Sequence, residues 1–473
     1  MLARKASEIA ALVGGELRGP DTQVGPDVCI DSRNISAGAL FVALKGERSD
    51  GHAYVADALD AGAGAALVER SSGKGTEIVV ADVLAAFQVL GRALVEEGKE
   101  RGMIALAITG SNGKTSTKDL LAQILEQVGP TVSPEGSYNN EIGVPLTACR
   151  IGADTRFLVA EMGARALGDI TALTEIVPPD IGAVLNVGVS HIGEFGSVEA
   201  IAQAKGELAE AAGEWAVLNA DDPRVAAMET NAKRAMFSVI GEPEGSLRVW
   251  ATEITADENQ RCSFVLHAAR HGDAKRMRVA EPRSMSMVKL QLPGRHQVAN
   301  AVAAAAAALA TGELSVKQVA AGLSAAKARS HWRMELGERD DGLRVLNDSY
   351  NANPVSMRAA LDALEGMRRQ GGRLIAVLGE MLELGPDAAV NHYEIGMYAA
   401  LHGVDIVIAV AGHCEDLAQG AFDGGAEGIA VADGPAALDV ALRIAAPQDV
   451  VLVKASRGIA LEHVAFGLLE GNR

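Results

Sequence analysis

Short apolar runs, each followed by polar turn residues and a helical pattern, repeat along most of the chain. Between residues 103 and 220 they are Ile104–Ile108, Phe157–Ala160, Ile181–Leu185 and Ala216–Leu218. Strands that are apolar throughout are typical of a parallel sheet covered by helices on both faces. Ligands bind such sheets at the carboxyl ends of the strands. This part of the chain is therefore predicted to be an α/β domain with a ligand site at one edge of its sheet.

Two further blocks flank this one. The first hundred residues contain apolar strands at 39–44 and 65–68 and a helical run over 83–97, which leads to the polar stretch 96–102. A second strand–helix series starts near residue 328, with strands at 344–346, 374–378, 406–410, 429–431 and 450–453. We therefore expect an α/β protein of three domains, over residues 1–101, 102–327 and 328–473.

The segment between the second and third blocks has a different pattern. Residues 245–292 are more polar and alternate with apolar positions, which predicts a small antiparallel insertion. An alanine-rich helix is expected from about 297 to 311, and another near 315–326.

Charge and cysteine content narrow the class of protein. The 473 residues carry a net charge of −18, which argues against a non-specific nucleic-acid binder. The four cysteines are far apart and lack zinc-binding spacing, as in reduced cytosolic proteins. The longest apolar run, 301–310, is too short to span a bilayer, and the first residues show no signal-peptide core. We expect a cytoplasmic protein with no membrane insertion and no nucleic-acid partner.

The stretch AITGSNGKTSTK, residues 107–118, follows a predicted strand and precedes a helical pattern at 118–128. Gly110 and Gly113 let backbone amides turn toward an anion, Lys114 would reach terminal phosphates, and the Thr115 hydroxyl would meet Mg²⁺. A glycine turn with an incidental lysine is the alternative. The strand–loop–helix context favours a nucleotide-binding loop, although Ile108 stands where the general pattern has its first glycine.

Three single residues could carry chemistry near that loop. Glu161 follows a predicted strand and could hold Mg²⁺, or be an exposed strand-end carboxylate. A loop histidine such as His191 is more often structural than a ligand. Lys205 shares a helix face with Ile201 and Leu208, so it either extends to solvent, which the residues alone favour, or is buried with a lowered pKa. A buried neutral amine could react with CO2 to give a carbamate able to bind a second Mg²⁺.

Three polar clusters lie where ligand loops are expected. Residues 294–300 open the alanine-rich helix and could read a base edge or simply cap the helix. Residues 330–335 contain an arginine that could stabilise a transferring phosphoryl group or be a solvated linker residue. Residues 347–354 follow a strand and form either a ligand loop or an Asx-rich turn that ends in proline.

Taken together, these stretches resemble the Mur ligase family. Its order of motifs is matched by TGSNGKTSTK, EMGARALGDI, NVGVSHIGEFGSVEAIAQAKGEL, GRHQVANA, HWRME, NDSYNANP and VLVKASRG. DSRNISAGALFVALKGERSDGHAY, GSYNNEIGVPLT and VLGEMLELG are similar to the family member that adds D-alanyl-D-alanine. The resemblance covers essentially the whole chain and is weakest around 230–285. It implies a small UDP-sugar-binding domain, a central P-loop domain with a parallel sheet, and a Rossmann-like C-terminal domain.

The resemblance also implies an activity and its partners. The expected reaction is an ATP-dependent, ADP-forming amide ligation that joins D-alanyl-D-alanine to UDP-N-acetylmuramoyl-tripeptide. It proceeds through an acyl phosphate, in cytoplasmic peptidoglycan precursor synthesis. ATP, two Mg²⁺ ions and a lysine carbamylated by CO2 are implied with it, and the expected state is a monomer.

Each candidate residue has a role under this resemblance. ATP would be bound by Gly110, Ser111, Asn112, Gly113, Lys114, Thr115, Ser116, Asn300, Arg333 and Asp348. The catalytic residues would be Lys114, Lys205, His191 and Arg333. The metal ligands would be Thr115, Glu161, His191 and carbamylated Lys205. The UDP-linked substrate would be bound by Ser32, Arg33, Lys45, Gly46, Asp50, Gly51, His52, Asn139 and Asn140. The dipeptide would be bound by Tyr350, Asn351, Lys454, Ser456 and Arg457.

The chain departs from the family pattern at Ala166, Gln297 and Ala455. A Cβ at residue 455, where the family usually has glycine, is expected to change the turn near the dipeptide. Two other classes fit the nucleotide loop. One is another amide ligase of the superfamily, such as the enzyme that adds the third residue or a folylpolyglutamate-type ligase. The other is a P-loop switch or assembly ATPase, which would hydrolyse ATP without an amine acceptor.

Overall fold

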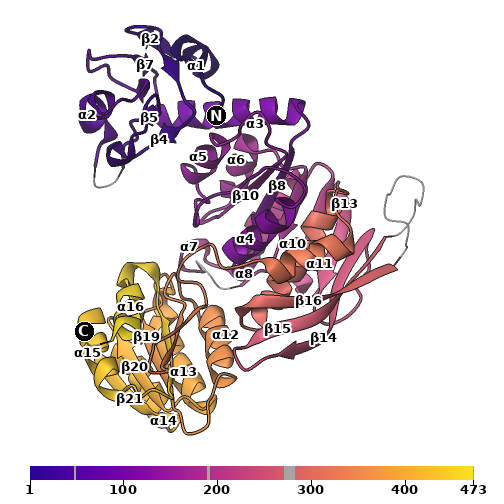
Figure 1. The fold of residues 1–473 in the computed structure, drawn as a ribbon, viewed down its shortest axis with the longest axis vertical. Helices are drawn as coiled ribbons and strands as arrows, with labels where there is room; N and C mark the ends of the chain where they lie inside the picture. Colours follow the sequence, from indigo (N-terminus) through magenta and orange to yellow (C-terminus); the bar gives the residue numbers. More distant parts are fainter. Residues whose placement is uncertain (47–48, 189–191, 271–282, 472–473) are drawn as a thin grey trace.

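The computed structural model describes residues 1–46, 49–188, 192–270 and 283–471 (Figure 1). Three larger sheets follow one another along the described chain, each with its own helices, and they form three bodies arranged in sequence order. We call them the N-terminal, central and C-terminal bodies. No helix of the described ranges combines the length and apolar character needed to cross a membrane. The three-domain α/β architecture predicted from the sequence is confirmed, while the residue limits of the domains stay a prediction.

The N-terminal body is built on a five-stranded sheet in the order β2-β7-β6-β5-β4, parallel except for β2, and a separate β1–β3 pair. Its longest helix, α3, is capped by the Asp82 carboxylate and packs on the N-terminal and central bodies. Because the apolar face continues to Gly98, α3 ends three residues later than the pattern predicts. The elements are β1 Arg4–Lys5, α1 Ala6–Val13, β2 Glu16–Arg18, β3 Gln23–Val24, β4 Val28–Cys29, β5 Leu40–Val42, α2 Val55–Asp60, β6 Ala65–Val68, β7 Glu77–Val79 and α3 Val83–Glu100, with 3-10 turns at Ser32–Asn34 and Gly51–Tyr54.

The central body holds a nine-stranded sheet in the order β16-β15-β14-β13-β12-β11-β8-β10-β9. From β9 to β14 it is parallel, and β14, β15 and β16 are antiparallel. The strands are β8 Ile104–Thr109, β9 Thr131–Val132, β10 Phe157–Glu161, β11 Ile181–Val184, β12 Trp215–Asn219, β13 Lys233–Ser238, β14 Leu247–Ala256, β15 Arg261–Arg270 and β16 Arg283–Pro293. The helices are α4 Lys114–Leu125, α5 Gly143–Ala148, α6 Asp169–Ile176, α7 Ile192–Phe195, α8 Val198–Ala211, α9 Pro223–Ala226, α10 His296–Ala310 and α11 Val316–Ala325.

The antiparallel segment continues the central sheet and is not a separate insertion. Val249, Phe264 and Val288 on its buried face belong to the same core cluster as α10, and the opposite face is exposed over much of β16. That one-sided burial produces the alternating pattern. The alanine side chains of α10 are nearly all buried, since small residues let this helix pack closely on α4 and the sheet.

The C-terminal body has a six-stranded sheet in the order β17-β18-β22-β19-β20-β21, parallel except for β17. Helices α12 to α14 cover one face and α15 and α16 the other. The elements are β17 Glu335–Glu338, β18 Arg344–Asn347, α12 Pro354–Glu365, β19 Leu374–Gly379, α13 Ala388–Leu401, β20 Ile406–Val410, α14 Cys414–Asp423, β21 Glu427–Val431, α15 Gly434–Ile444, β22 Val450–Lys454 and α16 Glu462–Glu470, with 3-10 turns at Gly385–Asp387 and Arg457–Ile459.

Candidate active site

A cavity of about 870 Å³ lies where the carboxyl ends of β8, β10 and β11 face the start of the C-terminal body. It is lined by the loop after β8, by α8 and the start of α10, and by loops of the C-terminal body. It brings together most of the residues that the sequence selected for nucleotide, metal and dipeptide binding. These are Ser111, Asn112, Gly113, Lys114, Thr115, Ser116, Glu161, Lys205, Asn300, Arg333, Asp348, Tyr350, Asn351 and Lys454. Asn139 and Asn140, which the sequence selected for the UDP-linked substrate, also line it.

The nucleotide-binding loop is hydrogen-bonded to the segment that follows β11. Asn186, two residues after β11, accepts a hydrogen bond from the Asn112 amide through Oδ1 at 2.8 Å. The Ser111 hydroxyl accepts another from the Gly188 amide at 2.8 Å. Gly113, in the left-handed conformation, forms the N-cap of α4, so this helix begins at Lys114, four residues earlier than predicted. The positive end of α4 therefore lies at the loop itself.

Gly113 also allows a close approach of Asn300, the predicted adenine contact. A Cβ built on Gly113 would lie 2.2 Å from Oδ1 of Asn300, and the φ of Gly113 is +83°. Asn300 is further held by its amide nitrogen, which donates to Gln297 at 3.0 Å. The side chain of Asn300 thus packs directly against the loop.

Gly113→Ala should raise the KM for ATP by about tenfold or more and lower the unfolding temperature. The methyl group would displace Asn300, and alanine would be strained at this positive φ. Steady-state kinetics and thermal unfolding would measure both effects. Gly312→Ala is the matched control, because Gly312 also has a positive φ but nothing lies within 4 Å of its Cβ position. If both variants raise the KM for ATP equally, the contact with Asn300 is irrelevant.

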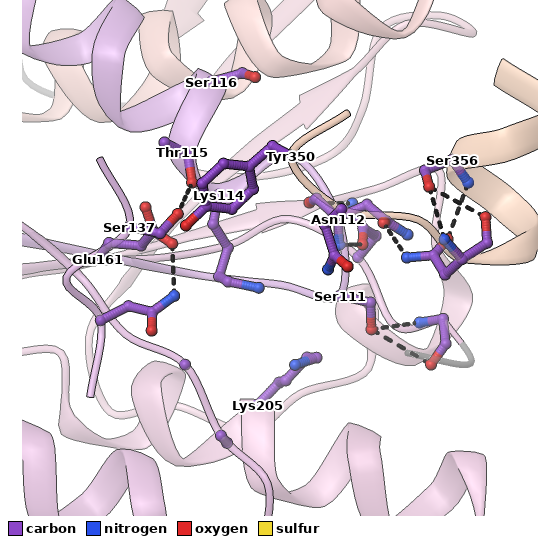
Figure 2. A pocket seen from close by; sticks show the side chains of 18 of the residues that line it. Ser111, Asn112, Lys114, Thr115, Ser116, Ser137, Glu161, Lys205, Tyr350 and Ser356 are labelled. Carbon is purple, nitrogen blue, oxygen red and sulfur yellow. Dashed lines mark hydrogen bonds between the residues drawn. The ribbon is translucent and has the colours of Figure 1, made fainter. Parts of the chain in front are cut away.

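Lys114 points into the cavity from the loop (Figure 2). Its amine donates to the Gly110 carbonyl at 2.8 Å, and no carboxylate is paired with it among the described residues. Burial lowers the pKa of the Lys114 amine, an effect that the Glu161 charge opposes and Arg333 reinforces. An anion bound at the loop would satisfy this amine.

Glu161 offers an oxygen that fits a metal ion. It is the last residue of β10 rather than an exposed residue after it, and it is buried. Its Oε1 accepts from the Asn139 amide nitrogen at 2.8 Å, while the buried Oε2 has no hydrogen-bond partner. The Thr115 hydroxyl lies in the same cavity, 2.7 Å from the Ser137 hydroxyl. Hard oxygen donors of this kind suit Mg²⁺.

The rest of the predicted metal set is only partly described. His191 lies outside the described residues. Within the described ranges there is no cluster of three or more His, Cys, Asp or Glu side chains that could hold a metal. Among the described residues, a metal at this place would therefore depend on Glu161 and on hydroxyl groups.

Lys205 is buried, so the expectation from the residues alone that its side chain extends to solvent is wrong. The side chain lies on α8 beside the buried Ile201 and Leu208 and is 3% exposed. Burial, together with the nearby Lys114 charge, lowers the pKa of the Lys205 amine to about 7. Lys205 makes no hydrogen bond or ion pair with any described residue. Figure 2 shows Lys205 and Lys114 entering the same space from opposite sides.

Arg333 reaches the cavity from the start of the C-terminal body. Its Nη2 donates to the Ser137 hydroxyl at 2.9 Å, and its guanidinium carbon lies 4.0 Å from the centroid of the Tyr350 ring. Trp332 and Met334, on either side of it, have positive φ values of 61° and 52°. Because its side chain lines the cavity and makes these contacts there, Arg333 is not a solvated linker residue.

The sequence did not select Ser137 or Asn186 as site residues. Ser137 connects the Thr115 hydroxyl to Arg333, which stands 196 positions later. Ser137 occurs in the quoted stretch GSYNNEIGVPLT, and Asn186 ends a predicted strand. Membership of that motif and the position at a strand end are the sequence signals that could have identified these two residues.

The buried Lys454 pairs with the half-buried Asp348 at the C-terminal side of the cavity. Their Nζ to Oδ2 distance is 2.5 Å, and Lys454 also donates to the Asn351 carbonyl at 2.8 Å. The other Asp348 oxygen accepts from the Met334 amide at 3.1 Å. Asp348 therefore links Lys454 to the backbone at Met334, in addition to any contact with a nucleotide.

Gly110, Ser456 and Arg457 do not line the cavity. Arg457 pairs with Glu462 at 2.7 Å and lies 4.4 Å from the centroid of the Trp332 ring. Ala455, the expected source of an altered turn, is buried with its Cβ facing Gly379, and its φ is outside the left-handed region.

The residues predicted for the UDP end lie together in the N-terminal body, away from the cavity. Ser32 and Arg33 follow β4, and Lys45, Gly46, Asp50, Gly51 and His52 follow β5. In this group the Asp50 carboxylate lies 2.7 Å from Nδ1 of His52, whose Nε2 accepts from the Glu69 amide at 2.9 Å. These positions are the carboxyl ends of adjacent parallel strands.

Three protein-family models match successive parts of the chain. The Mur ligase family catalytic domain matches residues 27–102, the Mur ligase middle domain 108–308, and the Mur ligase glutamate ligase domain 332–457. A UDP-N-acetylmuramoyl-tripeptide–D-alanyl-D-alanine ligase from Mycobacterium tuberculosis (strain H37Rv) is 42% identical, over 99% of this chain and 98% of the relative. The ligase of that name from Escherichia coli K12 is 34% identical over 99% of both chains.

Solved structures show the same likeness. MurF from Acinetobacter baumannii superposes with a TM-score of 0.84 at 30% identity, covering 99% of each chain. MurF ligase from Thermotoga maritima, solved in complex with ADP, gives a TM-score of 0.75 at 26% identity, covering 94% of this chain and 97% of that one.

Proposed function

The chain belongs to the Mur ligase family, and we propose that the central cavity is the catalytic site at which it joins D-alanyl-D-alanine to UDP-N-acetylmuramoyl-tripeptide. The protein is an ATP-dependent, ADP-forming ligase of peptidoglycan precursor synthesis. One observation carries the site assignment. The loop amine of Lys114, the unpartnered oxygen of Glu161, the Lys205 amine and the guanidinium of Arg333 meet in one cavity between two bodies.

ATP is assigned to the loop after β8 and the start of α10. The loop amides and the positive end of α4 would bind its phosphates, with Lys114 at the terminal ones. Asn300 would contact the adenine and Asp348 the ribose. The ADP complex of the Thermotoga maritima relative supports a nucleotide in this fold.

Mg²⁺ would be held by Glu161 and Thr115, with His191 as a further ligand by family resemblance. The fit rests on the orphaned Glu161 oxygen and on the Thr115 hydroxyl in the same cavity. When bound, Mg²⁺ would offset phosphate charge at this place.

Lys205 is proposed to be carbamylated. Its neutral amine would attack CO2, forming the N–C bond and releasing one proton, which leaves a carboxylate at the end of the side chain. A pKa of about 7 leaves about half of the amines neutral at pH 7, against about one in a few thousand for an ordinary lysine. The carbamate would then provide an oxygen ligand for a second Mg²⁺ and pair with the charge of Lys114.

The reaction needs an activated carboxylate, because oxide is a poor leaving group. The terminal carboxylate of the tripeptide attacks the γ-phosphorus of ATP, giving an acyl phosphate and ADP. The amine of D-alanyl-D-alanine then attacks the acyl carbon, and phosphate leaves from the tetrahedral intermediate. Lys114 and Arg333 would reduce the repulsion between the two approaching anions. Enclosure between the bodies would keep water from the acyl phosphate.

The substrates would approach from the two outer bodies. The UDP end is assigned to the group around Asp50 and His52, with the peptide arm reaching the cavity past Asn139 and Asn140. The dipeptide is assigned to the C-terminal side, near Tyr350, Asn351 and the turn 454–457. We further propose that the protein works in the cytoplasm as a monomer.

Phosphate release with UDP-N-acetylmuramoyl-tripeptide, measured with and without D-alanyl-D-alanine, tests this function. We expect sustained phosphate release only when both substrates are present, with one molecule of amide product formed for each phosphate released. Release that needs neither substrate would indicate an ATPase, and release with a different amino acid acceptor would indicate another ligase of the superfamily.

A further inference from the structure

The turn at residues 380–385, after β19, contacts the 454–457 turn on one side and α7 of the central body on the other. On one side the Leu382 amide donates to the Ser456 hydroxyl at 2.9 Å, and the Ser456 amide donates to the Glu380 carbonyl at 3.1 Å. On the other side the turn rests on α7 of the central body. A Cβ built on Gly193 of that helix would lie 3.3 Å from the Glu383 carbonyl oxygen.

His392 fixes the backbone of this turn from inside the C-terminal body. Its ring is fully buried on α13. Nδ1 lies 2.7 Å from the Ala388 carbonyl, which can only accept, so Nδ1 carries the hydrogen. The unprotonated Nε2 therefore accepts from the Met381 amide at 2.9 Å. Both ring nitrogens are used, and one of them holds the turn.

We propose that His392 is a positioning residue for the amide-forming step, because it holds the turn that sets Ser456 and seats the C-terminal body on α7. This inference rests on the proposed function, which assigns the dipeptide to the neighbourhood of the 454–457 turn. His392 does not line the cavity and would act through the turn alone. The nucleotide-binding loop, built on β8 and β11, is not part of this arrangement.

The test compares KM values for the two small substrates in the full-length enzyme. His392→Leu removes the acceptor for Met381, so we expect the KM for D-alanyl-D-alanine to rise about tenfold while the KM for ATP stays within about twofold. His392→Gln offers an oxygen near the position of Nε2 and should bring the dipeptide KM back to within about threefold of the wild type. A purely structural role would lower the unfolding temperature without changing one KM selectively.

His413→Asn is the matched control. His413 stacks on His392 with ring centroids 5.0 Å apart but makes no hydrogen bond to the turn, and asparagine tolerates its φ of 56°. Its KM values should match the wild type.

A second variant keeps the test decisive if His392→Leu does not fold. Ser456→Ala removes the hydroxyl that accepts from the Leu382 amide, and combining it with His392→Gln should give less than the product of the two separate effects. Equal rises in both KM values, or a glutamine variant as impaired as the leucine one, would overturn the inference. A wild type without dipeptide-dependent phosphate release would instead overturn the proposed function.

Discussion

Lys205→Ala should lower the turnover of ADP formation by at least about 100-fold, and formate or acetate should restore part of it. The variant removes the amine that would become a carbamate, while alanine leaves room on α8 for a small carboxylate to enter. The Lys205 side chain is buried and makes no hydrogen bond or ion pair with the described residues, so the substitution removes no described polar contact. Coupled assays of ADP formation with a series of small carboxylates would measure both effects.

Gln203→Ala, at an exposed position on the same helix, is the control. Its turnover should match the wild type, and added formate or acetate should not change it. The carbamate can also be observed directly, as an NMR signal from isotope-labelled bicarbonate that is present in the wild type and absent in Lys205→Ala. Near-wild-type turnover of the alanine variant would exclude the carbamate role.

The labelled signal should grow as the pH rises from about 6 to 8. With a folded pKa of about 7, the Lys205 amine is mostly protonated below pH 7 and becomes neutral as the pH rises through that value. The neutral form reacts with CO2. A signal that weakens over this range, with bicarbonate held constant, would contradict the assignment.

The sequence predicted the architecture well where the pattern was regular. Apolar runs such as Phe157–Ala160 are the core strands of the parallel sheets, because burial on both faces demands apolar residues throughout. The alternating segment 245–292 was harder to place. Its period indicates strands with one exposed face but cannot show that β14 pairs with β13 and so extends the central sheet.

The predicted site depended on where strands end, and this worked for Lys114 and Glu161, which follow or end adjacent strands. It could not find Ser137, whose partners are Thr115 on the nucleotide loop and Arg333 in another body. Nor could helical spacing decide the state of Lys205. The face shared with Ile201 allows either burial or solvent contact, and the packing of α8 against the central sheet decides it.

Resemblance to a family assigned roles to residues for which the spacing of residues predicted none. It grouped Asp50 and His52 with a UDP site, and both do lie at the carboxyl edge of the N-terminal sheet. It did not indicate that Ser456 would be buried and bonded to the turn 380–385 instead of facing the cavity. This hydrogen bond joins Ser456 to a loop that lies about 75 positions earlier in the chain, so only the three-dimensional structure shows it.

Lys114→Ala should lower ADP formation by at least about 100-fold while the affinity for UDP-N-acetylmuramoyl-tripeptide stays within about threefold of the wild type. The amine lies in the cavity and bonds only to Gly110 among the described residues, so its removal affects the phosphates most. The residues assigned to the UDP end are in the N-terminal body, outside the cavity. Stopped-flow or coupled assays would follow ADP, and calorimetric titration without ATP would follow binding of the UDP-linked substrate.

The same substitution should not destabilise the fold. Burial lowers the pKa of the Lys114 amine, which means that the charged form is disfavoured there and costs folding free energy below its unfolded pKa. Removing the amine should therefore leave the unfolding temperature unchanged or slightly raised near neutral pH. Lys317→Ala, an exposed lysine on α11, controls for the change in net charge and should keep full activity. Loss of UDP-substrate binding together with a lower unfolding temperature would mean that the variant is misfolded, and that Lys114 supports the structure rather than the phosphates.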